Sequence, residues 1–178
     1  YLYTGDLGYM SKEGLLYVKG RFKSLLISSD GEKYSPEGIE EALVEKSPYI
    51  DQVMLYNNQS NYTTAVIVPN RDQLIRTLKV QGLDLSTEDG RKAALTILDG
   101  EINKYKKGGD FEGMFPERWL PTCFAVLSEP FTEQNQMINS TMKMVRGKIE
   151  KAYAERIAYM YTAAGKQLHN QQNIDALK

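Results

Sequence analysis

The 178-residue sequence predicts an α+β fold, with a small mixed sheet of three strands covered by helices and an additional two-stranded hairpin. Three observations predict it. Apolar runs typical of strands lie at residues 52–56, 63–68 and 122–127. Apolar residues at helical spacing lie between these runs and after the last one. An Asp-Gly pair at residues 30–31, between the short runs 25–27 and 32–34, is typical of a tight hairpin turn.

The first elements of the chain are short. A strand is expected at residues 14–18, followed by a basic, glycine-containing joint at residues 19–23. Residues 25–27 and 32–34 are expected to pair across the Asp-Gly turn. Residues 1–21 look like the edge of a preceding domain, because the sequence opens in mid-pattern without an initiator methionine. We therefore expect a C-terminal fragment of a longer chain.

The first helix is expected to begin at Ser35 and Pro36, as N-cap and first helical residue, and to end before Pro48. Ile39 and Leu43 form its apolar face.

The two strands that follow, residues 52–56 and 63–68, are expected to be joined by a turn at residues 57–61. The next helix, marked by apolar residues at 74–78, is expected to end near Gly82.

Thr87 is expected to cap another helix, with Leu95, Leu98 and Ile102 on one face. The helical pattern is expected to end by the two glycines at residues 108–109.

The last third of the chain begins with an irregular stretch at residues 108–121, followed by the third strand. A long amphipathic helix is then expected to begin between residues 140 and 146. Residues 165–178, rich in Gln and Asn, are expected to be a frayed tail. The apolar face of the long helix comprises Met142, Val145, Ile149, Tyr153, Ile157 and Met160.

Charge and cysteine content narrow the function classes. The chain has 22 Lys and Arg against 23 Asp and Glu, which excludes the strongly basic field of a general nucleic-acid binder. Its mean hydropathy of −0.46 and the absence of an apolar run of about 18 residues exclude a membrane-spanning helix. The one cysteine, Cys123, is interpreted as a small buried strand residue, and a reducing, cytoplasmic setting is expected.

Four residues could contribute chemistry, although each also has a plain structural explanation. Asp6 could bind a diol such as a ribose, or could complete a turn. Arg21 offers donors for phosphate or sugar oxygens, or for a surface ion pair. Gly31 allows a ligand close to the backbone, or simply a turn. Lys143, between two methionines, could meet a phosphate or carboxylate, or could be an exposed lysine at a helix start.

Taken together, several runs resemble the adenylate-forming superfamily of acyl-CoA synthetases, peptide-synthetase adenylation domains and luciferases. The first runs are YTGDLG at residues 3–8, GLLYVKGRFK at 14–23 and LISSDGEKYSPEGIE at 26–40. PNR at residues 69–71 and EPFTEQN at 129–135 are similar to the long-chain fatty acid–CoA ligase branch. The resemblance extends to about residue 164 and depends on the joint occurrence of these runs in order.

This resemblance implies a domain division. Residues 1–21 would be the C-terminal edge of a missing N-terminal domain and residues 22–24 a hinge. Residues 25–164 would be the C-terminal lid domain of the adenylate-forming fold, followed by the tail at residues 165–178.

The resemblance also implies residue roles. Asp6 would bind the ribose hydroxyls of ATP, with Arg21 beside it, and Lys23 would occupy the hinge position. Gly31 would lie on a hairpin that borders the pantetheine tunnel of CoA. Lys33 stands two positions after this glycine, where the family often has a different basic residue, and is assigned to CoA as well.

Lys143 would be the catalytic lysine, bridging carboxylate and phosphate during adenylation. The run INSTMKMVR at residues 138–146 fits the segment of the long-chain branch that carries this lysine, with departures at residues 139–140 and at Val145. Lys148, in a Gly-Lys-Ile run, is the alternative, because many members of the superfamily show Gly-Lys at this point.

The resemblance implies a fatty acid–CoA ligase that uses ATP, Mg2+ and CoA, with the metal bound mainly by the missing N-terminal domain. The expected partners are the fatty acid, ATP, CoA and that domain, without nucleic acid; peripheral contact with a membrane is left open. We expect the 178 residues to be inactive alone. The alternatives are another superfamily enzyme with a different acid or acceptor, and a non-catalytic module that kept the fold.

Overall fold

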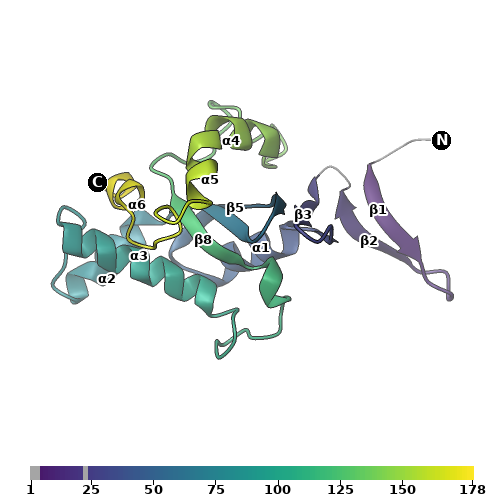
Figure 1. Ribbon diagram of the computed structural model, residues 1–178, viewed down its shortest axis with the longest axis horizontal. Coiled ribbons are helices and arrows are strands. Elements are labelled where there is room, and N and C mark those ends of the chain that lie inside the picture. Colours follow the sequence, from purple (N-terminus) through teal and green to yellow (C-terminus); the bar gives the residue numbers. More distant parts are fainter. Residues whose placement is uncertain (1–4, 22–23) are drawn as a thin grey trace.

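The computed structural model describes residues 5–21 and 24–178 and arranges them as a small sheet covered by helices on both faces, with a hairpin at one end (Figure 1). The α+β class and the mixed three-stranded sheet predicted from the sequence are confirmed.

The main sheet has the strand order β5 (Ile50–Tyr56), β7 (Thr63–Pro69) and β8 (Pro121–Val126). β5 is antiparallel to β7, and β8 is parallel to β7. All seven residues of the central strand β7 are buried, which explains its continuous apolar run, since a strand covered on both faces needs no alternation.

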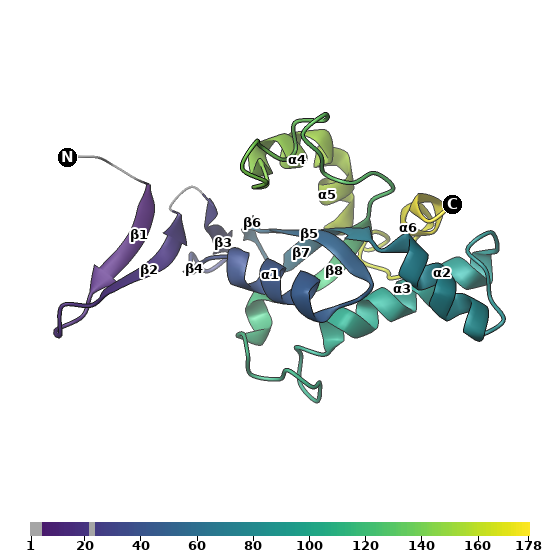
Figure 2. The ribbon, with the colours of Figure 1, turned by 180° about the vertical axis from the view of Figure 1, so that it is seen from behind.

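Helices cover the two faces of this sheet (Figures 1 and 2). One face packs against α1 (Glu37–Lys46), α2 (Arg71–Val80), α3 (Glu88–Asn103) and α6 (Gln171–Ala176). The other packs against α4 (Arg146–Ala152) and α5 (Ala154–Met160). Successive residues of β7 alternate between these two apolar clusters, as the period of a strand requires.

A second, smaller sheet contains the hairpin predicted from the Asp-Gly pair. β3 (Leu26–Ser28) and β4 (Lys33–Tyr34) are antiparallel, and β6 (Asn58–Ser60) joins β3 in parallel. The predicted turn at residues 57–61 therefore contains a strand, whose partner lies about 30 positions away in sequence.

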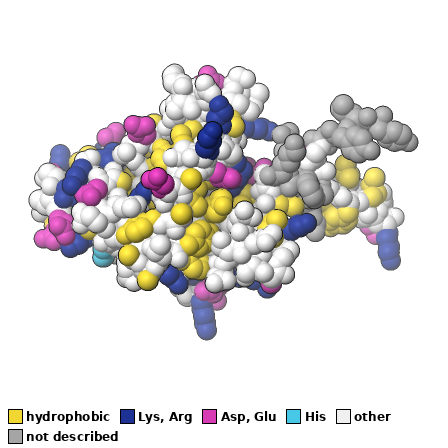
Figure 3. All heavy atoms as spheres, turned by 45° about the horizontal axis from the view of Figure 1, so that its top comes forward, with side chains coloured by type: hydrophobic (Ala, Val, Ile, Leu, Met, Phe, Trp, Pro, Cys, Tyr) yellow, Lys and Arg dark blue, Asp and Glu magenta, His cyan; other side chains and the backbone are white. Residues whose placement is uncertain are grey.

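The N-terminal hairpin comprises β1 (Asp6–Met10) and β2 (Leu16–Arg21), which pair antiparallel. It extends from the end of the molecule that carries β3 (Figures 1 and 2). Large apolar side chains lie on its surface, and some are visible as yellow spheres at the right of Figure 3. Those of Met10, Leu16 and Val18 are 63%, 65% and 65% exposed.

Helices α2 and α3 are each capped at the N-terminus by the side chain of the residue that precedes the helix. Asn70 accepts a hydrogen bond from Gln73 N, and Thr87 accepts one from Gly90 N, as predicted for Thr87. Helix α1 differs from the prediction, because it begins at Glu37 without a side-chain cap bond. Ser35 is therefore not its N-cap.

The helix expected to begin between residues 140 and 146 does begin in that range, at Arg146, but two details of the prediction are wrong. Met142, assigned to its apolar face, lies outside any helix, in a left-handed conformation with φ of 60°. Tyr153, with φ −110° and ψ 23°, separates α4 from α5. Its N–H bonds Ile149 O at 2.9 Å and its carbonyl accepts from Ile157 N at 2.8 Å, so the four-residue spacing survives the break. Apolar spacing correctly predicted that Ile149, Ile157 and Met160 are buried, but it wrongly included Met142, which is 75% exposed, and it did not indicate the break at Tyr153.

Residues 165–178 are not a frayed tail. They contain α6, with Ile174 and Leu177 buried in the main core. Arg71 donates hydrogen bonds to the carbonyls of the last three residues, at 2.6–3.3 Å. These bonds satisfy carbonyls that the end of α6 leaves open.

Cys123 is buried in β8, as interpreted from the sequence. Among the described residues, every helix is too short or too polar to cross a bilayer.

Candidate functional site

The loop that carries Lys143 borders a groove of about 840 Å3 between α1 and the segment 138–146. Lys143 is exposed and lines this groove. Lys148, the alternative lysine, lines a separate depression of about 380 Å3 and donates a hydrogen bond to Gln136. The two candidates therefore lie on different surfaces of the same segment.

Asn139 sets the shape of the Lys143 loop. Its side-chain oxygen accepts hydrogen bonds from Thr141 N at 3.0 Å and Lys143 N at 2.9 Å. Its own N–H donates to Lys143 O at 2.9 Å, and a single bridge pairs Ile138 with Met144. Asparagine forms such local side-chain bonds to the backbone readily. The loop is thus a small closed turn with Lys143 at its returning end.

A buried ion pair lies at the base of this loop. Arg146 donates to both carboxylate oxygens of Glu40, at 2.8 and 2.9 Å, and also to Leu55 O. Glu40 accepts a further bond from Leu55 N at 2.6 Å and is only 4% exposed. Burial raises the pKa of Glu40, while the Arg146 charge and the Leu55 N–H act in the opposite direction.

Sequence reasoning assigned no role to Glu40 or Arg146. One signal was available, since Glu40 stands three positions before the apolar Leu43 and so shares its buried helix face. A carboxylate on such a face needs a partner. That the partner is Arg146, 106 positions away, could be known only from the tertiary structure.

Among the charged residues that line the groove, carboxylates outnumber cations. Those of Glu37, Glu41, Glu45 and Asp51 line it together with Glu40, against the cations Lys143 and Arg146. An anionic substrate is disfavoured there by like charge.

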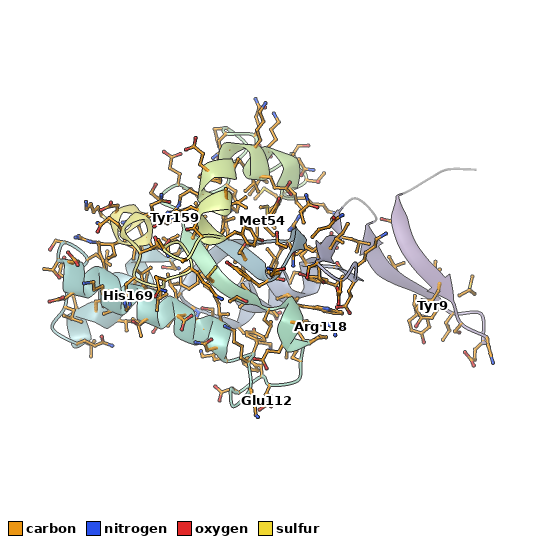
Figure 4. The ribbon with its side chains drawn as sticks, in the orientation of Figure 1. Tyr9, Met54, Glu112, Arg118, Tyr159 and His169 are labelled. Atoms are coloured by element: carbon orange, nitrogen blue, oxygen red, sulfur yellow. The ribbon has the colours of Figure 1, made fainter. Side chains whose placement is uncertain are left out.

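The hairpin that carries Gly31 is braced from another part of the chain. Gly31 has φ of +83° and donates to Ser28 O at 2.9 Å, closing the turn. Glu32 accepts from Arg118 at 2.5 Å and from the indole N–H of Trp119 at 3.1 Å; Arg118 is labelled in Figure 4. These two hydrogen bonds hold the pKa of Glu32 below its ordinary value.

The adjoining residues complete this brace. Tyr34 stacks on Trp119, with ring centroids 5.1 Å apart and planes 6° apart. Lys33 is exposed in β4, opposite Ile27. The turn is therefore rigidly placed, with a cationic residue on its second strand.

The other sequence-predicted residues lie on or near the N-terminal hairpin. Asp6 is exposed at the start of β1 and is the register partner of Arg21 in β2. The pairing brings together the backbones of the two residues assigned to ATP. The Arg21 side chain and the whole of Lys23 lie outside the described residues. Asp6, Gly31 and Lys33 do not line the groove of Lys143.

Solved structures with the same fold are adenylate-forming enzyme domains. The adenylation domain of a carboxylate reductase from Mycobacterium chelonae superposes with a TM-score of 0.73 at 24% identity, over 89% of this chain and 22% of that one. The adenylation domain of a carboxylic acid reductase from Segniliparus rugosus, in complex with AMP, gives 0.66 at 23% identity, over 89% and 23%. The described elements thus have the architecture of part of an adenylate-forming enzyme.

Curated relatives by sequence are acyl-CoA synthetases. Fatty acyl-CoA synthetase B of Dictyostelium discoideum is 27% identical over 168 residues, covering 91% of this chain and 24% of that protein. Long chain acyl-CoA synthetase 8 of Arabidopsis thaliana is 28% identical over 167 residues, covering 90% and 22%. A long-chain-fatty-acid–CoA ligase of Xenopus laevis is 24% identical over 189 residues, covering 96% and 25%.

No family model matches the chain. The resemblance drawn from the sequence motifs is nevertheless confirmed: the relatives include long-chain acyl-CoA synthetases, and the structural neighbours are adenylate-forming enzymes. The chain spans about a quarter of the length of the relatives it matches.

Proposed function

We propose that this chain is the C-terminal part of an AMP-forming long-chain fatty acid–CoA ligase. In the first half-reaction, the fatty acid carboxylate attacks the α-phosphate of ATP, forming acyl-adenylate and releasing pyrophosphate. In the second, the CoA thiol attacks the acyl carbon, forming the thioester and releasing AMP. The observation that carries the proposal is the set of ordered motifs together with the exposed Lys143 on a closed loop.

Lys143 is the proposed catalytic lysine of adenylation. The reaction brings a carboxylate against a phosphate, so two anions must meet while further charge develops in the transition state. A fixed cation offsets this repulsion and stabilises that charge. The loop supplies such a cation on a backbone closed by Asn139. The acidic groove beside it supports a site formed with another surface, where the anions are held.

Domain alternation follows from this requirement. The thiol of CoA needs the position that the lysine occupies during adenylation, so the two half-reactions demand two placements of the C-terminal domain. Residues 22–24, which include Lys23, are the proposed hinge between residues 1–21 and residues 25–164. The exposed apolar side chains of β1 and β2 support packing of this hairpin against an N-terminal domain.

The remaining roles are divided between the hairpins. Asp6 and Arg21 are proposed to bind the ribose of ATP, supported by their backbone pairing. Gly31 and Lys33 are proposed to border the CoA tunnel, supported by the braced turn.

The Mg2+ ion is assigned to the N-terminal domain. Among the described residues, no group of three or more His, Cys, Asp or Glu side chains is placed to hold a metal ion. We expect the 178 residues alone to be inactive, because the phosphate loop and acyl pocket would lie elsewhere.

The test uses the full-length protein that carries this chain. Fatty-acid-dependent ATP–pyrophosphate exchange measures adenylation, and thioester formation from supplied acyl-adenylate measures the second step. Lys143→Ala should lower exchange by about 100- to 1,000-fold, the usual cost of removing a transition-state charge stabiliser, and should spare thioester formation. Lys148→Ala is the matched control. If Lys148→Ala is the inactive variant instead, the lysine assignment is wrong. Exchange with other acids only would refute the long-chain substrate class.

A further inference from the structure

We propose that the Glu40–Arg146 ion pair is a positioning device for Lys143, which fixes the lysine loop to helix α1 for the adenylation step. The inference rests on the proposed function of Lys143. Neither Glu40 nor Arg146 is proposed to touch a substrate; both act through the backbone of the loop.

The contacts make Arg146 a rigid connection. Its guanidinium donates to both oxygens of Glu40 and to Leu55 O, so α4, α1 and β5 meet at one side chain. Both backbone polar groups of Leu55 therefore bond to the ion pair, because its N–H donates to the same carboxylate at 2.6 Å. The side chains of Arg146 and Glu40 are 15% and 5% exposed, so solvent screens the pair little. A planar fork with several donors suits this geometry, and an ammonium group cannot reproduce it.

The short chain distance carries the effect to Lys143. Arg146 is the first residue of α4 and stands three positions after Lys143. Between them, Val145 N donates to Met137 O at 2.8 Å, which holds the end of the loop against its start. The backbone of Lys143 itself is bonded twice to Asn139: its N–H donates to the Asn139 side-chain oxygen, and its carbonyl accepts from Asn139 N. A loop closed on itself and held at its base has little freedom to move the lysine.

The position of Glu40 adds a functional consequence. Helix α1 begins at Glu37, three positions after β4, which belongs to the hairpin of Gly31. The ion pair therefore joins the lysine loop to the same helix that follows the proposed CoA hairpin. The groups assigned to the two half-reactions are thereby held in one rigid body, as a swinging domain requires.

A buried ion pair gains little over well-packed apolar residues, because desolvation offsets the attraction, so the pair is weak evidence for a purely stabilising role. Removal of one partner still leaves an uncompensated buried charge, which is why both half-reactions and the double variant are needed in the test. The Arg146 guanidinium also contacts no group of the Gly31 hairpin in the described structure. Its loss should consequently affect adenylation selectively.

The experiment measures both half-reactions in the full-length protein for Arg146→Gln, Glu40→Gln and the double variant. Arg156→Gln is the matched control, because Arg156 also donates to a strand carbonyl, Val126 O at 2.9 Å, and to two side chains, but lies away from the loop. Amide hydrogen exchange of residues 139–145 is followed in parallel. It reports the order of the loop whether or not the chemistry is altered.

The inference predicts that Arg146→Gln lowers adenylation about 100-fold, the scale of a misplacement of about 1 Å, while thioester formation stays near wild type. Arg146→Lys should restore part of the loss. The double variant should be no worse than either single variant, since one interaction is lost in all three. Residues 139–145 should exchange faster in Arg146→Gln and at the wild-type rate in Arg156→Gln.

Two results would overturn the inference while the ligase proposal stands. One is wild-type adenylation in Arg146→Gln; the other is an equal fall of both half-reactions, as expected for Arg156→Gln if it merely destabilises the fold. An inactive wild type, or normal exchange in Lys143→Ala, would instead refute the proposed function and remove the basis of the positioning role. The Lys143→Ala result separates the two failures.

Discussion

Replacing Asn173 with alanine should destabilise the protein strongly, although Asn173 lies in a polar segment close to the C-terminus. Its side-chain oxygen accepts from Val126 N at 3.0 Å, and its side-chain nitrogen donates to Phe124 O at 3.0 Å. These two backbone groups point outward from the free edge of β8, so the Asn173 amide takes the place of a neighbouring strand. The same oxygen accepts from Arg156 at 2.9 Å.

The magnitude follows from the groups that would lose their partner. Asn173 is 1% exposed, so alanine leaves a buried N–H and a buried carbonyl of the β8 edge unsatisfied. Each such group costs about 1–3 kcal/mol. Water entering the space left by the amide recovers part of this, and we expect a loss of about 2–4 kcal/mol in the free energy of unfolding. Asn173→Asp should be similarly harmful, since a carboxylate cannot donate to Phe124 O.

The assay is urea-induced unfolding, followed by far-ultraviolet circular dichroism, with Gln171→Ala as the control. Gln171 is an exposed residue of the same helix and bonds only to Asp175 in the described contacts. The midpoint should fall for Asn173→Ala with little change in slope. Equal midpoints for the two variants would show that the β8 edge needs no side-chain partner and would refute the reasoning.

Three further predictions concern single side chains. Burial raises the pKa of the Cys123 thiol from 9.0 to about 11. The thiol of the unfolded chain therefore ionises first, and the free energy of unfolding should fall as pH rises between these two values. A thiol reagent at pH 8 should label Cys123 only after unfolding. The pKa of Glu32 is lowered by Arg118, so the hairpin brace should persist at neutral pH and be lost as pH falls through that lowered value; fluorescence of the one tryptophan should report this, and Glu32→Gln should abolish the transition. Gly31→Ala should lower the free energy of unfolding by about 1–2 kcal/mol, through the positive φ alone, since an added Cβ meets no atom within 4 Å. Under the proposed function this variant should slow thioester formation and spare ATP–pyrophosphate exchange. The reverse pattern would contradict the assignment of Gly31 to CoA.

The arrangement of charge around Lys143 has a bearing on how the proposed enzyme would work. The cation stands at the border of a groove whose other charged walls are mostly carboxylates. Fatty acid and ATP are both anions, so they are not expected in that groove. A site completed by a second surface, reached by movement of the domain, resolves this conflict and agrees with a chain that covers about a quarter of its relatives.

Local chemistry in the sequence determined much of the fold. The Asp-Gly pair at residues 30–31 sets a turn because glycine accepts positive φ, and Thr87 caps α3 because its hydroxyl reaches a nearby N–H. The apolar runs of the three main strands identify a buried sheet. The motif run around Lys143 identified a candidate lysine, whose role stays a prediction.

The tertiary structure decided the features that depend on distant partners. Strand β6 pairs with β3, α6 completes the core through Ile174, and Arg146 meets Glu40, all across long separations in sequence. A polar composition cannot reveal that α6 is held by Arg71 and by the edge of β8. The physical reason is the same in each case. Local propensity covers only contacts a few residues apart, whereas the burial of a polar group is stabilised by whichever partner the folded chain brings to it.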